Sequence, residues 1–323
     1  MGTKNIELIK DKKIVSELIL IDGTHRSGKS MIGPILASFD GVEIVRTEPI
    51  IEALPQLYKL KKIEKDAAVT LLQREIDMML YNSMISRNIN FRIKDRTGVW
   101  KNANTIEYFK RLFYKDGDVV LERIKSEKRI FQIEVHDILP VVDLYFETFG
   151  KGLRIIELVR HPIDLVHTKD GPSFSTCLQS NPRYWRLTFK SKNKAVPYYA
   201  YGWIDEFLDA SPVNRAIKII QRFSNKMRIK HESLSEAQKS QVLIIPFERF
   251  AISPYKYLDL ISNFIGKGIT KNTHKVLKKE KVPREINPKE RERKMKLIKE
   301  KASKECLDML DKLIYEYEQK YLN

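Results

Sequence analysis

An eight-residue loop near the N-terminus constrains the fold more than any other feature of this chain. Residues 23–30 read GTHRSGKS, match the pattern GxxxxGK[ST], and follow directly on the apolar run Ser16–Asp22. A continuous apolar run that enters a glycine turn is typical of a buried parallel strand, and the residues after Gly28 have a helical pattern. The sequence therefore predicts a strand, a phosphate-binding loop and a helix, in that order.

The loop has the chemistry to bind phosphate or sulfate. Its glycines let the backbone fold closely, so that successive N–H groups point inward, and the N-terminus of the following helix adds a partial positive charge. Arg26 and Lys29 add two full charges. The candidate ligand-binding residues of the loop are His25, Arg26, Ser27, Gly28, Lys29 and Ser30.

Further strands are expected along the chain, separated from one another by helical segments. Val42–Val45 is a short candidate, and Arg129–Val135, Leu153–Val159 and Val242–Pro246 are β-rich runs. This alternation predicts an α/β protein with a three-layer, P-loop-type fold, in which helices flank a mostly parallel central sheet. Ligands of such folds bind beyond the carboxyl ends of the strands.

We expect a single domain over residues 1–323, with three additions to the sheet and its helices. A helical insertion covers about residues 51–128, an aromatic and basic excursion covers about 169–210, and one long amphipathic helix covers about 288–322. The excursion should cover the active face and bind the acceptor. The helix after the loop contains Pro34, so it should kink there or begin later than the motif suggests.

The composition excludes several classes of protein. Apolar residues make up 42% of the chain and charged residues 31%, which is typical of a folded protein and not of a disordered one. No apolar run is long enough to span a bilayer, and the first residues do not resemble a secretion signal. Cys177 and Cys306 lie far apart, so neither disulfides nor a zinc site is expected. We expect a soluble, cytoplasmic protein.

The net charge of +17 would suit nucleic acid, anionic lipid or a small polyanionic substrate. Much of the excess lies between Lys275 and Lys304, where interspersed glutamates and a helical spacing favour a solvated helix face. The chain contains no recognised nucleic-acid-binding module, so we expect no nucleic-acid partner. A nucleic-acid binder nevertheless remains a third hypothesis beside two enzymatic ones. The oligomeric state is left open.

A second motif lies where the run Leu153–Val159 ends. Arg160 follows this strand candidate, and a helix should begin directly after it, because Pro162 and Asp164 are residues that favour a first turn. Thr168 lies two turns along that helix. An arginine before a helix is commonplace, so this motif gains its meaning only together with the loop.

Together, Arg26–Ser30 and Arg160–Asp164 resemble the two donor-binding motifs of sulfotransferases that use 3′-phosphoadenosine 5′-phosphosulfate (PAPS). Thr47-Glu48-Pro49 and Pro246–Phe250 also resemble segments of that family, with carbohydrate and tyrosyl-protein sulfotransferases the most similar in motif. The resemblance implies that the loop holds the phosphosulfate and that Arg160 and Thr168 hold the 3′-phosphate. It implies no metal, and Arg284 is a further candidate for binding the donor or its product, PAP.

Lys29 departs from the family, which usually has Thr or Ser at this place. It completes the Walker pattern of ATP-binding proteins, so a Mg-ATP-dependent small-molecule kinase is the alternative function. A kinase needs a metal-binding carboxylate at a second strand end, for which only Asp137 and Glu248 are placed. In a sulfotransferase the ammonium of Lys29 would instead stabilise charge on the bridging oxygen, which makes it a catalytic candidate.

Two residues are candidates for the base that takes the proton of the acceptor hydroxyl. Glu48 is the first choice, because it follows a strand candidate and resembles the glutamate of glycan and tyrosyl-protein sulfotransferases. His136 is the second, because Glu134-Val135-His136 resembles the Lys-x-His of cytosolic sulfotransferases, although the lysine is missing. The expected reaction is sulfuryl transfer from PAPS to a hydroxyl. A glycan, a phenol and a peptide tyrosine are the candidate acceptors.

Overall fold

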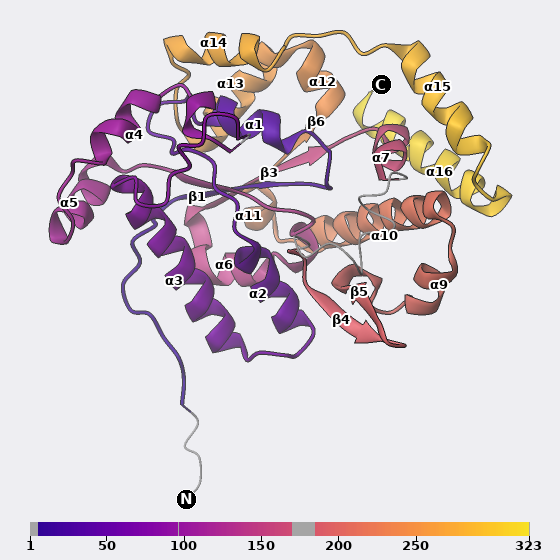
Figure 1. Cartoon of the computed structure of the whole chain (residues 1–323), viewed down its shortest axis with the longest axis horizontal. Coiled ribbons are helices and arrows are strands. Elements are labelled where there is room, and N and C mark those ends of the chain that lie inside the picture. The colour runs from indigo at the N-terminus through magenta and orange to yellow at the C-terminus, as the bar shows by residue number, and fades with distance from the viewer. Residues whose placement is uncertain (1–5, 96, 170–184, 323) are drawn as a thin grey trace, which may run out of the picture.

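A parallel sheet of four strands lies at the centre of the molecule, in the order β2-β1-β3-β6 (Figure 1). The computed structural model describes residues 6–95, 97–169 and 185–322, with the side chains of all of them except Thr168 and Lys169. The strands are β1 (Leu18–Asp22), β2 (Phe131–Glu134), β3 (Leu153–Val159) and β6 (Val242–Pro246). The expected α/β fold with a parallel sheet flanked by helices is therefore confirmed.

Side chains alternate along the strands and build one apolar layer on each face of the sheet. Leu18 and Leu20 of β1 pack on one side, and Ile19 and Ile21 pack on the other, all fully buried. The first layer is covered by α2 (Pro49–Lys59), α3 (Lys65–Met84), α5 (Asp118–Glu127) and α6 (Asp143–Phe149). The second is covered by α1 (Lys29–Leu36), α12 (Phe247–Ile252), α13 (Pro254–Ile265) and α14 (Lys271–Lys279).

The helix after the loop begins at Lys29, where the motif places it, and contains Pro34 in its interior. The following strand candidate, Val42–Val45, is not a strand. It lies beside β2 and forms only isolated parallel bridges, Val42 with Ile130 and Arg46 with Ile133. The side-chain amide of Gln132 donates to the carbonyl oxygen of Glu43 at 2.7 Å, so a side chain takes the place of a strand hydrogen bond there.

The region predicted as a helical insertion holds α2, α3, η1 (Val99–Lys101), α4 (Thr105–Arg111) and α5. A fully buried ion pair anchors it to the segment beside β2. The guanidinium of Arg111 donates to both carboxylate oxygens of Glu43, at 2.7 and 2.8 Å. The two hydrogen bonds offset the free-energy cost of removing the carboxylate and the guanidinium from water.

Residues 170–184 of the predicted excursion lie outside the part of the chain that the structure describes, as does Cys177. The rest of the excursion forms the hairpin β4 (Thr188–Ser191) and β5 (Lys194–Pro197), then η4 (Tyr198–Ala200) and α9 (Ile204–Asp209). The long helix α10 (Pro212–Ser233) and the short α11 (Glu236–Lys239) lead back to β6. Short 3-10 turns at η2 (Leu139–Val141) and η3 (Gly150–Gly152) flank α6.

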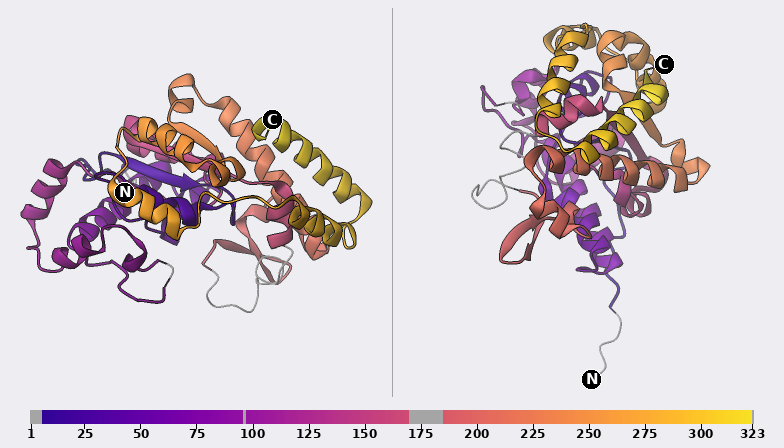
Figure 2. Two further views of the ribbon diagram at one scale, coloured as in Figure 1. Left: turned by 90° about the horizontal axis from the view of Figure 1, so that it is seen from above. Right: turned by 90° about the vertical axis from the view of Figure 1, so that its right-hand side faces the viewer.

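The prediction of one long C-terminal helix is wrong. The chain forms α15 (Pro288–Lys299) and α16 (Lys304–Tyr321), which are separated by a turn. The second helix begins after Ser303, because the hydroxyl of this residue accepts a hydrogen bond from the backbone N–H of Cys306 and caps the N-terminus of α16. Both helices pack with α10 and with α7 (Pro162–Lys169), at the end of the sheet opposite α4 and α5 (Figure 2).

Candidate active site

The phosphate loop connects β1 to α1 and packs directly on the ends of two neighbouring strands. Gly28 has a φ of 113°, and a Cβ there would lie 2.4 Å from Cδ2 of Phe247, the residue after β6. Gly23 has a φ of 132°, and a Cβ there would lie 2.3 Å from the carbonyl oxygen of Leu158 in β3. Only glycine fits this combination of left-handed backbone and close approach.

Lys29 points back into the loop. Its side chain is 3% exposed, and its ammonium donates to the carbonyl oxygens of Gly23 and Thr24, the latter at 3.2 Å. A buried ammonium needs such oxygens to replace water. Its positive charge also opposes the rise in pKa of two nearby carboxyls, Glu52 and Glu157. The loop thus holds a full positive charge in its interior.

Two aspartates tie the loop to the turn that follows β2. The hydroxyl of Thr24 donates to Oδ1 of Asp137 at 2.9 Å. The carboxylate of Asp22, at the end of β1, accepts from the backbone N–H groups of Ile138 at 2.9 Å and Leu139 at 2.7 Å. Because His136 lies in the same turn, these bonds fix its place beside the loop.

His136 is the centre of a chain of titratable side chains. Its Nδ1 lies 2.7 Å from Oε1 of Glu52 in α2, and its Nε2 lies 3.5 Å from Nδ1 of His25 in the loop. Burial raises the pKa of Glu52 to about 7, although the charges of Arg186 and Lys29 and a hydrogen bond from His136 oppose the rise. The pKa of the Glu52 carboxyl thus lies near neutral pH, the range in which a general acid or base acts.

Glu48, the residue just before α2, lies in the same region with a different environment. Its side chain is 39% exposed, and its carboxylate lies 3.3 Å from the guanidinium of Arg46. Glu48 is thus solvated and ion-paired, whereas Glu52 is mostly buried against His136.

Two arginine side chains from distant parts of the chain, Arg160 and Arg284, meet beside the loop. Arg160 donates to the carbonyl oxygen of Arg26 at 2.8 Å, and its guanidinium carbon lies 4.4 Å from the ring centre of Phe247. The guanidinium carbon of Arg284 lies 5.2 Å from the same ring centre. Burial and the charge of Arg160 lower the pKa of Arg284. Like charges held this closely favour an anionic ligand.

A polar cleft of about 680 Å³ opens beside the loop and brings most of the predicted residues together. The predicted residues that line it are His25, Arg26, Gly28, Lys29, Ser30, Glu48 and His136. Ser27 is buried, and its hydroxyl oxygen has no hydrogen-bond partner within the described ranges. Arg160 and Arg284 lie at Phe247 and not in this cleft. The side chain of Thr168 lies outside the described residues.

Glu52 and Arg186 belong to this region, and reasoning from the sequence missed both. Arg186 lies near Glu52 and Asp137. Burial lowers its pKa, and the charges of these two carboxyls are among the contributions that raise it. The only sequence signal for Glu52 is its place in the first turn of the helix that begins at Pro49, next to the better match Glu48. Neither residue falls in a motif.

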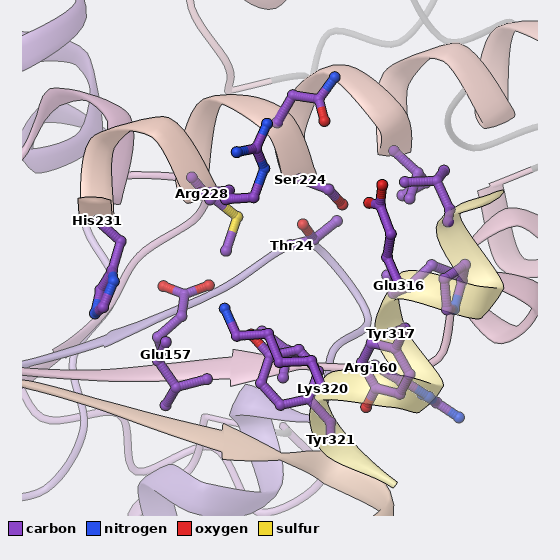
Figure 3. Close-up of a pocket in the computed structure, with 18 of the residues that line it drawn as sticks. Thr24, Glu157, Arg160, Ser224, Arg228, His231, Glu316, Tyr317, Lys320 and Tyr321 are labelled. Carbon is purple, nitrogen blue, oxygen red and sulfur yellow. The ribbon is translucent and has the colours of Figure 1, made fainter. Parts of the chain in front are cut away.

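A second cavity, of about 160 Å³, lies between β3, α10 and α16 (Figure 3). Glu157 points into it and is fully buried. Burial and the nearby carboxylate of Asp22 raise the pKa of Glu157 well above its ordinary value. Thr24 and Arg160 also line the cavity, which therefore adjoins the loop from the other face of the sheet.

The two carboxylates proposed for a kinase metal site are engaged within the protein. Asp137 accepts from Thr24, and Glu248 accepts from the backbone N–H of His161 at 3.0 Å and from the hydroxyl of Tyr317. Among the residues with described positions, no group of three or more His, Cys, Asp or Glu side chains is arranged to hold a metal ion. No helix in the described part of the chain is both long and apolar enough to cross a bilayer.

Comparison with known proteins finds similarity only at the level of three-dimensional structure. No family model and no curated protein matches the sequence. The sulfotransferase domain of the curacin biosynthetic pathway is 12% identical, over 80% of this chain and 77% of that one, with a TM-score of 0.44. A sulfotransferase from Mycobacterium avium is 11% identical, over 96% and 78%, with a TM-score of 0.41. One from Alicyclobacillus acidocaldarius is 13% identical, over 92% and 95%, with a TM-score of 0.37.

The similar structures thus carry the name of the family that the two sequence motifs resemble. At this level of similarity, the roles of residues in those proteins cannot be assigned to residues of this chain. Those roles have to come from the geometry of the loop, the arginines and the His136 region in this chain.

Proposed function

We propose that this protein is a sulfotransferase that moves a sulfuryl group from PAPS to a hydroxyl of an acceptor and leaves PAP. The observation that carries the proposal is the meeting of Arg160 and Arg284 with the phosphate loop at Phe247. This arrangement offers two adjacent anion sites, one made by the loop and one by the two guanidiniums. PAPS has two such anionic groups, whereas ATP has no phosphate at its 3′ position.

In this proposal the backbone N–H groups of residues 25–30 bind the phosphosulfate, together with Arg26 and Lys29. Lys29 leaves the carbonyl oxygens of Gly23 and Thr24 and donates to the bridging oxygen, where charge develops. Arg160, Thr168 and Arg284 bind the 3′-phosphate. The bound donor supplies an activated sulfuryl group, so the protein itself needs only to orient the reactants and to accept a proton.

We assign the role of base to His136, with Glu52 as its positioning residue, instead of to Glu48. His136 lies beside the loop, faces His25 and is oriented by Glu52 through its Nδ1. Its Nε2 faces Nδ1 of His25, and in this proposal the acceptor hydroxyl replaces that contact and gives its proton to Nε2, in the tautomer that Glu52 favours. Glu48 is ion-paired with Arg46 and remains the alternative base. No metal takes part in the proposed reaction.

Calorimetry with PAP in the presence of EDTA, compared with Mg-ATP, tests the proposal directly. We expect PAP to bind without metal and more tightly than Mg-ATP. Arg160→Ala should weaken PAP binding by about 10- to 100-fold, the value of one charge-assisted contact, and should affect adenosine 5′-phosphosulfate much less. Arg154→Ala, at the opposite end of the same strand, is the control. Tight Mg-ATP binding without PAP binding would favour the kinase instead.

The assignment of the base is tested by turnover. His136→Ala should abolish sulfuryl transfer while PAP still binds, and Glu48→Ala should keep measurable transfer. The opposite pattern would return the role to Glu48.

A further inference from the structure

A third cavity lies between the base and the excursion, and neither the motifs nor the donor-binding residues use it. It has a volume of about 160 Å³. The size is close to that of an engineered cavity that binds one benzene molecule. We call it the tyrosine cavity. It is lined by Gln56, Lys59 and Leu60 of the α2 region, Asp137, Pro140 and Val141 after β2, Tyr198, Tyr199 and Tyr201 at η4, and Phe223 and Lys226 of α10.

The inner end of the tyrosine cavity lies at Asp137, the residue after His136. Asp137 is 2% exposed, follows His136 directly, and binds the loop residue Thr24 through only one of its oxygens. Its other oxygen, Oδ2, is buried and has no hydrogen-bond partner among the residues described. Tyr198 lies close by. Burial raises its pKa, and the charges of Asp137 and Glu52 raise it further. A ligand hydroxyl can satisfy the free oxygen of Asp137.

The walls of the cavity suit a flat ring. Tyr199 and Phe223 are each 5% exposed, and their ring centres lie 5.6 Å apart in an edge-to-face arrangement. Tyr198 meets Tyr199 in the same manner at 5.5 Å. Pro140 and Val141 close the opposite side. Aromatic side chains packed in this way bind rings through apolar burial and edge-to-face contacts.

The outer end of the cavity carries two lysines, Lys59 and Lys226. Neither Lys59 nor Lys226 takes part in an ion pair within the described part of the chain, although both are exposed at the rim. Partial burial and the charge of Lys59 lower the pKa of Lys226. The nearby Lys230 differs, because it is paired with Asp143 at 2.5 Å. Two unpaired ammonium groups beside a cavity favour an anionic ligand.

We propose that the tyrosine cavity is an anion-selective acceptor site, which takes one hydroxylated ring with a carboxylate or similar anion at its far end. This inference rests on the proposed function. The ring hydroxyl would lie towards Asp137 and His136, and the anion towards Lys59 and Lys226. In the transfer, the bond from sulfur to the donor phosphate oxygen breaks and a bond from sulfur to the ring oxygen forms. The hydroxyl proton passes to His136.

Three phenols that share a ring and differ in charge test this proposal. They are 4-hydroxyphenylacetate, 4-ethylphenol and tyramine, which carry a negative, a neutral and a positive group. We expect kcat/KM for sulfuryl transfer to fall in that order. Lys226→Glu should reduce kcat/KM for 4-hydroxyphenylacetate by about tenfold and raise it for tyramine, as expected for a charge reversed a few ångströms from the ligand.

Lys62→Glu is the matched control, since it makes the same change of charge on an exposed residue of the turn after α2 that does not line the cavity. It should leave the order of the three phenols unchanged. PAP affinity, measured by calorimetry on every variant, separates the two proposals. Normal PAP binding with equal turnover of the three phenols, or with turnover of none, overturns the anion-selective site alone. Absence of PAP binding overturns the proposed function as well.

Discussion

Glu52→Gln should stabilise the protein at alkaline pH and lose this advantage in acid. The pKa of Glu52 rises from an ordinary 4.5 to about 7 in the folded protein. Below pH 4.5 both the folded and the unfolded chain hold the proton, so the substitution should change little. Between pH 4.5 and 7 Glu52 is ionised in the unfolded chain but still protonated in the folded protein. The free energy of unfolding of the wild type therefore falls by about 1.4 kcal/mol per pH unit relative to that of the variant. Above pH 7 the difference should level off.

At high pH the free energy of unfolding of the variant should exceed that of the wild type by about 3 kcal/mol. The full pKa shift counts here, because the side chain of Glu52 is only 19% exposed and solvent screens it little. Gln keeps an oxygen that can accept from His136, so the packing around α2 should survive. Urea unfolding followed by circular dichroism at pH 5 and pH 8.5 measures the effect. Glu48→Gln is the control, since that side chain is 39% exposed and its change should stay within about 0.5 kcal/mol at both pH values. A stability difference for Glu52→Gln that does not vary with pH would refute the reasoning.

Two further substitutions test the loop and the anchor of the helical insertion. Gly28→Ala should raise the PAP dissociation constant more than about tenfold in calorimetry, because the new Cβ meets the ring of Phe247 at 2.4 Å. Gly117→Ala is its control, since Gly117 also has a positive φ but a Cβ there meets nothing within 4 Å. Glu43→Gln should lower the free energy of unfolding by about 3 to 5 kcal/mol in urea titrations, because it removes the buried partner of the Arg111 guanidinium and leaves only the partly exposed Glu107, whose carboxylate lies 3.3 Å from Nε. A loss below about 1 kcal/mol would contradict this.

The sheet could be predicted from the sequence because each strand is a short, continuous apolar run. Leu153–Val159 and Val242–Pro246 became β3 and β6 with the predicted bounds. Val42–Val45 failed as a strand, because the hydrogen bond at Glu43 goes to the side chain of Gln132. The break before α16 was also missed, since the apolar period continues across it and only the cap at Ser303 marks it.

The candidate site could be predicted where local sequence determines geometry, and not where distant segments meet. The positions of the loop residues and of Arg160 could be predicted because their motifs describe a strand end and a turn. Glu52 was not, because its partner His136 lies 84 residues away and nothing near either residue predicts their contact. The tyrosine cavity likewise needs α2, η4 and α10 at one place.

The bonds that join the loop to the turn after β2 have a consequence for how the reaction could be tuned. Asp22 and Asp137 fasten the element that holds His136 to the element that holds Lys29. In the proposed reaction, the loop that would bind the donor and the residue that would act as base therefore belong to one hydrogen-bonded frame. The residues that η4 and α10 contribute to the tyrosine cavity can vary in sequence without disturbing these bonds. Specificity and reactivity can thus change independently of each other.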